Sequence, residues 1–395
     1  MKRTKIAVLT ILLSTCLALV GWAGGGQEEP ADTAGAEPIK IALVSNLSGG
    51  TAEQGTAERD GWIMAMEEVN EAGGVNGREL TWVIGDSQGA PDRATSLARR
   101  FIETENVVAI AGGSSSAACL AVARVSVEKK VPMIGQGWAV PLYYEEPINE
   151  WFFGARINNI EFARAYASEA KKLGAQTVAA VVQNNAWGND AWAQVQKAAP
   201  EYGLQVLGET LIESGATEVT AEVSRAEALN PDVLLVLTYQ REQATVARGL
   251  TTLGWRPIVV GAGPSLEASV QMGEPEHMVG WFGAGTADLE DPALIAVLDK
   301  AEARFGYRHV LQNHFVHSYD AARAFLRALK AMDEPITGER VRDALETHSW
   351  GVELTAPVAG AIGGWKPGAG NHTLFSGDDL ITLTVNEDGK VVRAQ

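Results

Sequence analysis

The sequence predicts an α/β fold made of two doubly wound parallel-sheet lobes. Its 395 residues are too many for one ordinary core. Apolar segments of strand length alternate with stretches of helical pattern, each roughly 10 to 20 residues long. Because repeated strand-helix units of this spacing require parallel sheets with right-handed crossovers, we expect two such sheets, each covered by helices.

The individual elements follow from apolar runs and from glycine stop signals. Helices are expected over 163–173 and 191–202, because each pattern ends at a glycine, Gly174 and Gly203. Residues 356–392 have the composition of short strands and turns. The expected strands begin at Ile39, Leu80, Val107, Pro132, Thr177, Gln205, Val233 and Pro257.

The first residues predict a secretion signal over 1–23. Basic residues precede the apolar run 6–20, and Gly21-Trp22-Ala23 supplies a small-x-small cleavage site. The apolar run is shorter than the roughly 20 residues of a spanning helix. We therefore expect a protein secreted to the periplasm or another extracytoplasmic location.

Cys16 leaves an alternative open. Leu13-Ser14-Thr15-Cys16 resembles a lipoprotein cleavage box, in which the cysteine would be acylated and become the first mature residue. In either case residues 24–37, rich in Gly, Ala, Glu and Pro, are expected to form a disordered linker.

The charge excludes one class of partner. The formal net charge is −17, and no long run of one sign concentrates it. A strongly acidic surface repels nucleic acid, so we expect no nucleic-acid partner.

One stretch carries a family resemblance. In Asn70-Glu71-Ala72-Gly73-Gly74-Val75-Asn76-Gly77-Arg78-Glu79-Leu80, glycines end a helix and an Asn-Gly turn leads into a strand. Further motifs follow in one order: Ile41-Ala42-Leu43-Val44, Leu47-Ser48-Gly49, Asp86, Pro91, Ser114-Ser115-Ser116 and Val131-Pro132-Met133-Ile134. From about Ile39 to the C-terminus, the chain resembles the solute-binding proteins of the branched-chain amino acid ABC transporter type, the type I periplasmic binding proteins.

This resemblance implies two lobes, a three-strand hinge and a receptor function. A small organic solute would bind between the lobes as the hinge closes, and the loaded monomer would deliver it to ABC permease subunits. No cofactor, catalytic residue or metal is implied. The lobes would comprise 38–155 with 283–334 and 156–282 with 335–395, with crossings near 154–157, 280–285 and 332–337.

Family members often carry a disulfide in the first lobe. The positions that align with it are Gly89 and Ser115, and neither is a cysteine. Cys119 lies in a helix of small apolar residues, so we expect it to be a buried packing residue and not a nucleophile.

The serine run is the first candidate for the binding site. Ser114, Ser115 and Ser116 follow a strand and open a helix, where hydroxyls and free N–H groups can bind a carboxylate or another polar group. A helix cap alone is the alternative. The resemblance places Ser116 on the family's binding serine and Ser115 beside it.

Aromatic residues provide the next candidates. Gly137, Trp138 and Ala139 align with the loop that holds an amino acid's carboxylate and amine, although alanine replaces the family's threonine. Trp187 aligns with an aromatic over the ligand and Tyr239 with a second contact. For these rings, ordinary packing is the alternative.

Two aligned positions depart from the amino-acid-binding pattern. Gln54 replaces an aromatic at the cleft mouth, and Gly263 stands where amino-acid binders carry the acid that pairs with the ligand's ammonium. A buried unpaired ammonium is costly, so the ligand is expected to be a polar or aromatic carboxylate or amide. A branched-chain or other amino acid remains the competing ligand, with Glu242 or Asp288 as substitute acids.

A secreted hydrolase and a ligand-sensing module are the two alternative functions. A secreted hydrolase lacks support, because Gly112-Gly113-Ser114-Ser115-Ser116 has serine at the second glycine of a G-x-S-x-G elbow. His314 and His317 are three residues apart, but no H-E-x-x-H motif or third ligand accompanies them. A ligand-sensing module for a membrane receptor would use the same fold and stays open.

Overall fold

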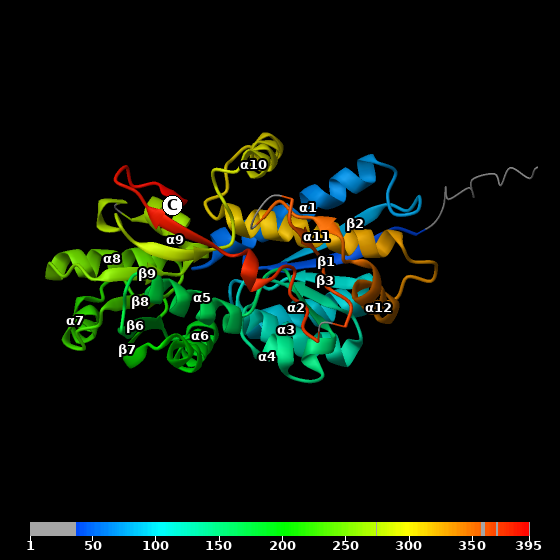
Figure 1. The fold of residues 1–395 in the computed structure, drawn as a ribbon. Coiled ribbons are helices and arrows are strands. Elements are labelled where there is room, and N and C mark those ends of the chain that lie inside the picture. Colours follow the sequence, from blue (N-terminus) through cyan, green and yellow to red (C-terminus); the bar gives the residue numbers. More distant parts are fainter. Residues whose placement is uncertain (1–36, 274, 357–359, 369, 395) are drawn as a thin grey trace, which may run out of the picture. The chain divides into compact units, whose positions relative to one another are not determined.

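Two sheets organise the part of the chain that the computed structural model describes, namely 37–273, 275–356, 360–368 and 370–394 (Figure 1). The first sheet consists of β1 (Ile39–Ser45), β2 (Leu80–Asp86), β3 (Ala109–Gly112), β4 (Met133–Gly135) and β5 (Phe152–Gly154). The second consists of β6 (Thr177–Gln183), β7 (Gln205–Ile212), β8 (Val233–Leu237), β9 (Ile258–Gly261), β10 (Phe282–Gly285), β13 (Ile381–Val385) and β14 (Val391–Arg393). The predicted signal peptide, Cys16 and all of the predicted linker except Glu37 lie outside the described residues.

Both sheets have the same doubly wound core. The first has the order β2-β1-β3-β4-β5, and all of its pairs are parallel. The second repeats this order as β7-β6-β8-β9-β10, again parallel, and adds β13 and β14 as antiparallel strands. The predicted α/β fold with parallel sheets is confirmed. The strand order reverses between β1 and β3 and between β6 and β8, and such switch points are where ligands bind in this class of sheet.

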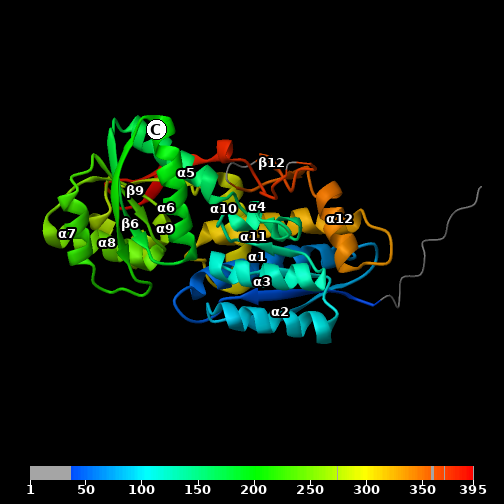
Figure 2. The same ribbon diagram turned by 90° about the horizontal axis from the view of Figure 1, so that it is seen from below.

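The alternation of side chains along β1 explains how the first sheet is covered on both faces. Ile41 and Leu43 pack in the core made with α1 (Ala52–Glu71) and α11 (Gln312–Lys330). Ala42 and Val44 pack in the core made with α2 (Pro91–Glu105) and α3 (Ser116–Lys129). Successive side chains of a strand point to opposite faces, so a continuous apolar run serves both cores. Figure 1 shows α1 beside α11, and Figure 2 shows α2 beside α3.

The same alternation occurs in β8 of the second sheet. Leu235 and Leu237 share a core with α5 (Asn159–Lys172) and α6 (Ala186–Ala198). Leu234 and Val236 share the other core with helices that follow β7, β8 and β9. These helices are α7 (Thr220–Ala228), α8 (Gln240–Leu253) and α9 (Gly263–Met272).

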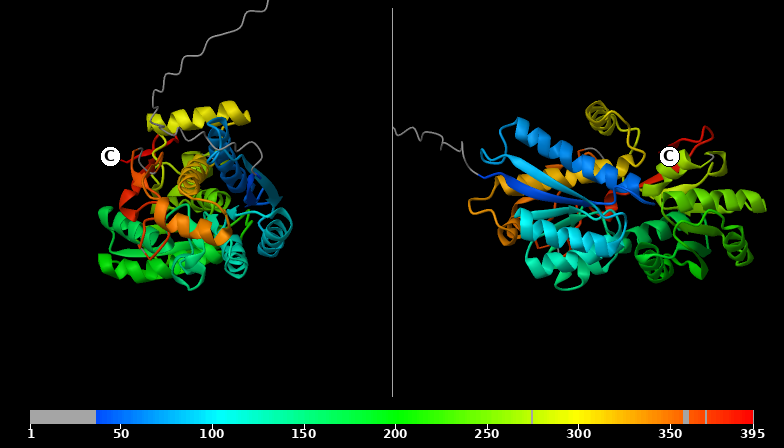
Figure 3. Two further views of the ribbon diagram at one scale, coloured as in Figure 1. Left: turned by 90° about the vertical axis from the view of Figure 1, so that its right-hand side faces the viewer. Right: turned by 180° about the vertical axis from the view of Figure 1, so that it is seen from behind.

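Further helices and short strands pack around the first sheet and its helices. α10 (Pro292–Phe305) packs against α1 and α11, and Figure 3 shows it, in yellow, beside α1. α12 (Gly338–His348) also packs against α11, and the strand pair of β11 (Val352–Glu353) and β12 (Ile362–Gly363) follows it. The short helix α4 (Pro141–Tyr144) precedes β5, whose Gly154 forms a bridge with Thr373.

The predicted lobe boundaries stay a prediction, and two elements bear on where they fall. β10 was divided between the lobes but is bonded entirely within the second sheet, between β9 and β13. α12 was assigned to the second lobe but packs against α11, which covers the first sheet. The bonds of β10 favour a boundary after Gly285, and the contacts of α12 place this helix with the first sheet.

Two smaller observations concern the cysteine and the membrane. Cys119 is free and buried, as expected for a packing residue, and burial raises the pKa of its thiol. Of the helices in the described ranges, none has both the length and the apolar composition that crossing a membrane requires.

Candidate functional site

A pocket of about 370 Å³ lies where loops from both sheets meet, and we call it the cleft pocket. Its volume is within the range of pockets that hold small molecules. Every lining residue follows the carboxyl end of a strand or ends that strand. From the first sheet come Gly50, Thr51, Gln88, Gly89, Ser115 and Ala117; from the second come Gln183, Asn185, Ala186, Trp187, Ser214, Gly215, Tyr239, Arg241 and Glu242. The cleft pocket therefore includes both switch points.

Direct bonds join the two sides of this pocket. Glu53, in the first turn of α1, forms an ion pair with Arg241 of α8. Beside it, Gln54 Nε2 donates to Gln240 Oε1 at 3.2 Å. These contacts hold the loops after β1 and β8 together at the pocket's edge.

The three predicted aromatic site residues meet between the sheets. Trp138, in the loop after β4, lies edge to face with Trp187 at a centroid separation of 5.5 Å. Trp187 stacks on Tyr239 at 5.2 Å, and Trp138 stacks on Phe162 of α5 at 4.5 Å. Trp187 and Tyr239 line the cleft pocket, whereas Trp138 lies behind them and is 7% exposed.

The two predicted serines have different positions. Ser115 is the N-cap of α3, where its hydroxyl accepts from Ala118 N at 3.3 Å, and it also lines the cleft pocket. Ser116 is buried, and its hydroxyl accepts from Trp138 N at 3.0 Å and Ala139 N at 3.2 Å. In this conformation Ser116 therefore holds the Trp138 loop and does not reach the pocket.

Four other predicted site residues do not line the cleft pocket, namely Gln54, Gly137, Ala139 and Gly263. A Cβ at Gly137 would lie 2.5 Å from Leu142 Cδ1, and one at Gly263 would lie 1.9 Å from the Ala284 carbonyl oxygen. Both glycines therefore serve close packing. Their binding roles, like those of the other residues, stay predictions.

Of the two substitute acids, only one is near the cleft pocket. Glu242 lines it and accepts from Gly215 N at 2.7 Å. Asp288 lies 3.6 Å from Arg393 and does not line the pocket. A third acid was missed: Glu267, one turn after Gly263, is buried, and burial raises its pKa to about 8 although Gln312, Arg308 and Asn313 oppose the shift.

Sequence reasoning also missed Glu58, on the buried face of α1. One oxygen, Oε2, accepts from Ser114 Oγ at 2.5 Å, from Ser114 N at 3.1 Å and from Ser45 Oγ at 3.3 Å. Burial raises the carboxyl pKa to about 7, although these bonds and the charge of Arg156 oppose the shift. In the sequence, Glu58 could have been recognised as a carboxylate that lies at helical spacing among apolar residues.

Arg156 is the second missed residue. It follows β5 and has no exposed surface. Its Nη2 donates to Asn313 Oδ1 at 2.8 Å, and its guanidinium carbon lies 5.3 Å from the centroid of the Trp138 ring. Burial lowers its pKa to about 9. A charged residue just beyond the apolar run Trp151-Phe152-Phe153, separated from it by Gly154 and Ala155, was the signal that could have found it.

The histidines of α11 lie in the same buried region. His314 Nδ1 is 2.8 Å from Asn313 Oδ1, and His317 stacks on Phe375. Burial, together with the charge of Arg156, keeps the pKa of both imidazoles well below the ordinary value. Within the described ranges, no group of three or more His, Cys, Asp or Glu side chains is placed to hold a metal ion.

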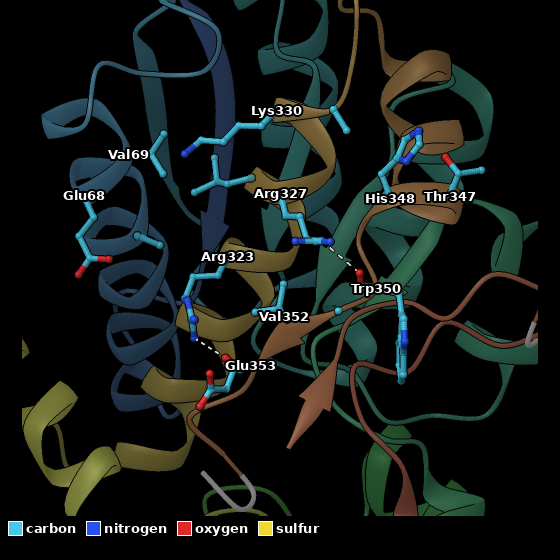
Figure 4. Close-up of a pocket in the computed structure, with 14 residues that line it drawn as sticks. Glu68, Val69, Arg323, Arg327, Lys330, Thr347, His348, Trp350, Val352 and Glu353 are labelled. Atoms are coloured by element: carbon cyan, nitrogen blue, oxygen red, sulfur yellow. Dashed lines mark hydrogen bonds between the residues drawn. The ribbon is translucent and has the colours of Figure 1, made fainter. Parts of the chain in front are cut away.

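A larger pocket of about 780 Å³ lies elsewhere, between α1, α11 and the segment after α12; we call it the α11 pocket. Arg323, Arg327 and Lys330 line it from α11 (Figure 4). Arg323 donates to Glu353 O and Arg327 donates to Trp350 O. Two of these three cations therefore bond to backbone oxygens of residues that line the same pocket. It contains none of the predicted site residues.

The chain is similar in sequence to a known protein family and to several relatives. The family model described as periplasmic binding protein matches residues 38–378. A leucine-, isoleucine-, valine-, threonine- and alanine-binding protein of Pseudomonas aeruginosa is 24% identical over 54% of this chain, and the match spans 57% of that relative. A Leu/Ile/Val-binding protein homologue of Brucella abortus is 22% identical over 76% of this chain and 78% of its own.

Solved structures share the fold. A type 1 periplasmic binding protein of Bordetella pertussis has a TM-score of 0.79 at 20% identity, covering 91% of this chain and 100% of its own. A branched-chain amino acid transporter substrate-binding protein of Streptococcus pneumoniae, in complex with isoleucine, has a TM-score of 0.75 at 19% identity with the same coverage. Since the family model spans most of the chain, the protein belongs to the periplasmic binding protein family.

Proposed function

We propose that this protein is an extracytoplasmic receptor that binds a small organic solute between its two sheets and delivers it to an ABC permease. The cleft pocket carries this proposal, because it combines loops from both sheets at their two switch points. The predicted Ser115, Trp187 and Tyr239 line it. The family and the fold are those of solute-binding proteins, which supports a role without catalysis.

The mechanism is closure of the two sheets around the solute. Glu53 with Arg241 and Gln54 with Gln240 are contacts that exist only when the loops of the two sheets meet. Closure would bury the solute and bring together the two halves of a surface for the permease. The crossing after β5, near 154–157, would be one strand of the hinge.

The solute is proposed to be a polar or aromatic carboxylate or amide, with a branched-chain or other amino acid as the competing ligand. The names of the relatives favour an amino acid. The Ala284 carbonyl oxygen leaves no room for an acid at Gly263, which argues against the usual pairing of an ammonium there. Trp187 and Tyr239 provide flat apolar faces for the rest of the solute.

The test is a titration with a panel of aliphatic amino acids, primary amides and aromatic carboxylates. Melting temperature and tryptophan fluorescence would be followed for the protein as secreted. We expect a saturable rise in melting temperature with one chemical class, because binding to the native state stabilises it. A protein that responds to no member of the panel would contradict the proposed ligand classes, and a response to amino acids alone would favour the competing ligand.

A further inference from the structure

Arg156 is an ionisable group whose hydrogen-bonding capacity is largely unused. It is fully buried, and its Nε and Nη1 atoms bond to no residue that the structure describes. Removing a guanidinium from water without hydrogen-bond partners is costly, because the lost hydration is not replaced. The unused N–H groups are therefore available to a hydrogen-bond acceptor that arrives from solution.

The charge of Glu58 favours the charged form of the Arg156 guanidinium, but the two side chains form no hydrogen bond. Its Oε2 accepts from Ser45 and Ser114, and its Oε1 bonds to no described residue. Within the described ranges, no ion pair joins Glu58 to Arg156. The single hydrogen bond of the guanidinium goes to the neutral amide oxygen of Asn313. Arg156 is therefore a buried cation without a bonded anion.

The surroundings of Arg156 connect it to the cleft between the sheets. Its guanidinium lies over the ring of Trp138, which belongs to the first sheet. The same ring contacts Phe162 and Trp187, which belong to helices of the second sheet. Separating the two sheets breaks these two ring contacts and uncovers part of Trp138, the ring over which the guanidinium lies.

We propose that Arg156 binds the carboxylate of the solute, whose apolar body then packs against Trp138 and Trp187. This inference rests on the proposed receptor function and narrows the solute to a carboxylate. The free N–H groups of Arg156 would donate to the carboxylate oxygens, and such charge-assisted bonds are stronger than bonds between neutral groups. Asn313 holds the guanidinium in place through Nη2 and leaves Nε and Nη1 for the solute.

The test compares the binding of a carboxylate with that of the neutral primary amide of the same shape, for example benzoate with benzamide, by calorimetric titration. We expect the wild-type protein to bind the carboxylate about 10- to 100-fold more tightly than the primary amide. Arg156→Gln should remove this preference by weakening the carboxylate alone. Arg164→Gln is the matched control, because Arg164 lies on α5 with its side chain 56% exposed, and it should change neither affinity.

Several outcomes overturn the inference. Equal binding of the acid and the amide by the wild-type protein would show that water and not the solute bonds to Arg156. Retention of the full preference in Arg156→Gln would remove this residue from the site. If Arg156→Gln does not fold, Arg156→Lys is measured in its place and should lose part of the preference for the acid, and full retention there would likewise remove Arg156 from the site. A protein that binds only amides contradicts this inference alone, whereas a protein that binds nothing contradicts the receptor function too.

Discussion

The indole rings of Trp138 and Trp187 meet edge to face with their centroids 5.5 Å apart, although they follow strands of different sheets. Tyr239 extends this contact, since it stacks on Trp187 at 5.2 Å. The aromatic cluster is thus formed from both sides of the cleft. Any motion that separates the sheets must expose these rings.

Trp187→Ala should weaken solute binding by roughly 10- to 100-fold, because truncating a buried aromatic anchor removes much of its contact energy. The matched control is Trp350→Ala, whose ring is 38% exposed in the α11 pocket. Affinities from calorimetric titration would be compared for the two variants after their folding is verified. Equal affinities would exclude Trp187 from the site.

The ion pair between Glu53 and Arg241 should slow the release of the solute. Its two side chains are 24% and 52% exposed, so we expect a modest contribution of about 0.2 to 1 kcal/mol. Glu53→Gln should therefore raise the dissociation rate by up to about fivefold, with a smaller effect at high salt. Stopped-flow fluorescence measures this rate. An unchanged rate at low salt would show that the pair does not stabilise the closed state.

Gly263→Ala should destabilise the protein by about 1 to 3 kcal/mol, because the added Cβ would lie 1.9 Å from the carbonyl oxygen of Ala284. Gly50→Ala is the control, since nothing lies within 4 Å of its Cβ position. Urea denaturation would measure both variants. If Gly263→Ala is as stable as the wild type, close packing is not the reason for glycine at this position.

Glu58 should make stability depend on pH in a specific direction. Its folded-state pKa of about 7 lies above the ordinary glutamate value of 4.5, so the unfolded chain ionises first as pH rises. The wild type therefore loses stability between about pH 4.5 and 7, by about 3 kcal/mol for a shift of this size. Glu58→Gln stays neutral throughout, and its stability relative to the wild type should improve by this amount.

The comparison of Glu58→Gln with the wild type is made by denaturation at several pH values. Taking the difference between the two proteins at each pH cancels the contributions of other titrating groups, including Glu267, Asp320 and the buried histidines. A difference that does not change with pH would contradict the raised pKa of Glu58.

Much of the fold was predictable because parallel strands buried on both faces are continuous apolar runs. The starts predicted for β1, β2, β6, β7 and β8 are those observed. The helices α5 and α6 begin earlier than expected, at Asn159 and Ala186, because Asn158 and Asn185 cap them through side-chain oxygens. Apolar periodicity does not detect such caps, since the capping asparagine is a polar residue that lies just outside each helix.

The candidate site was predictable only in part. Alignment to a family places residues such as Ser115, Trp187 and Tyr239 at the ends of strands, and the structure brings these three to one pocket. Glu58 and Arg156 were missed because their environment depends on packing between elements far apart in the chain. Buried charge is a property of the tertiary structure, and no local pattern determines which hydrogen bonds are left unmade.

Hydrogen exchange measured by mass spectrometry, with and without the solute that most raises the melting temperature, tests the central claim most directly. Binding between the two sheets predicts slower exchange in both sets of loops, over 47–51 and 113–117 from the first sheet and 184–188 and 239–243 from the second. Protection confined to 323–330 and 347–353, which line the α11 pocket, would contradict binding in the cleft.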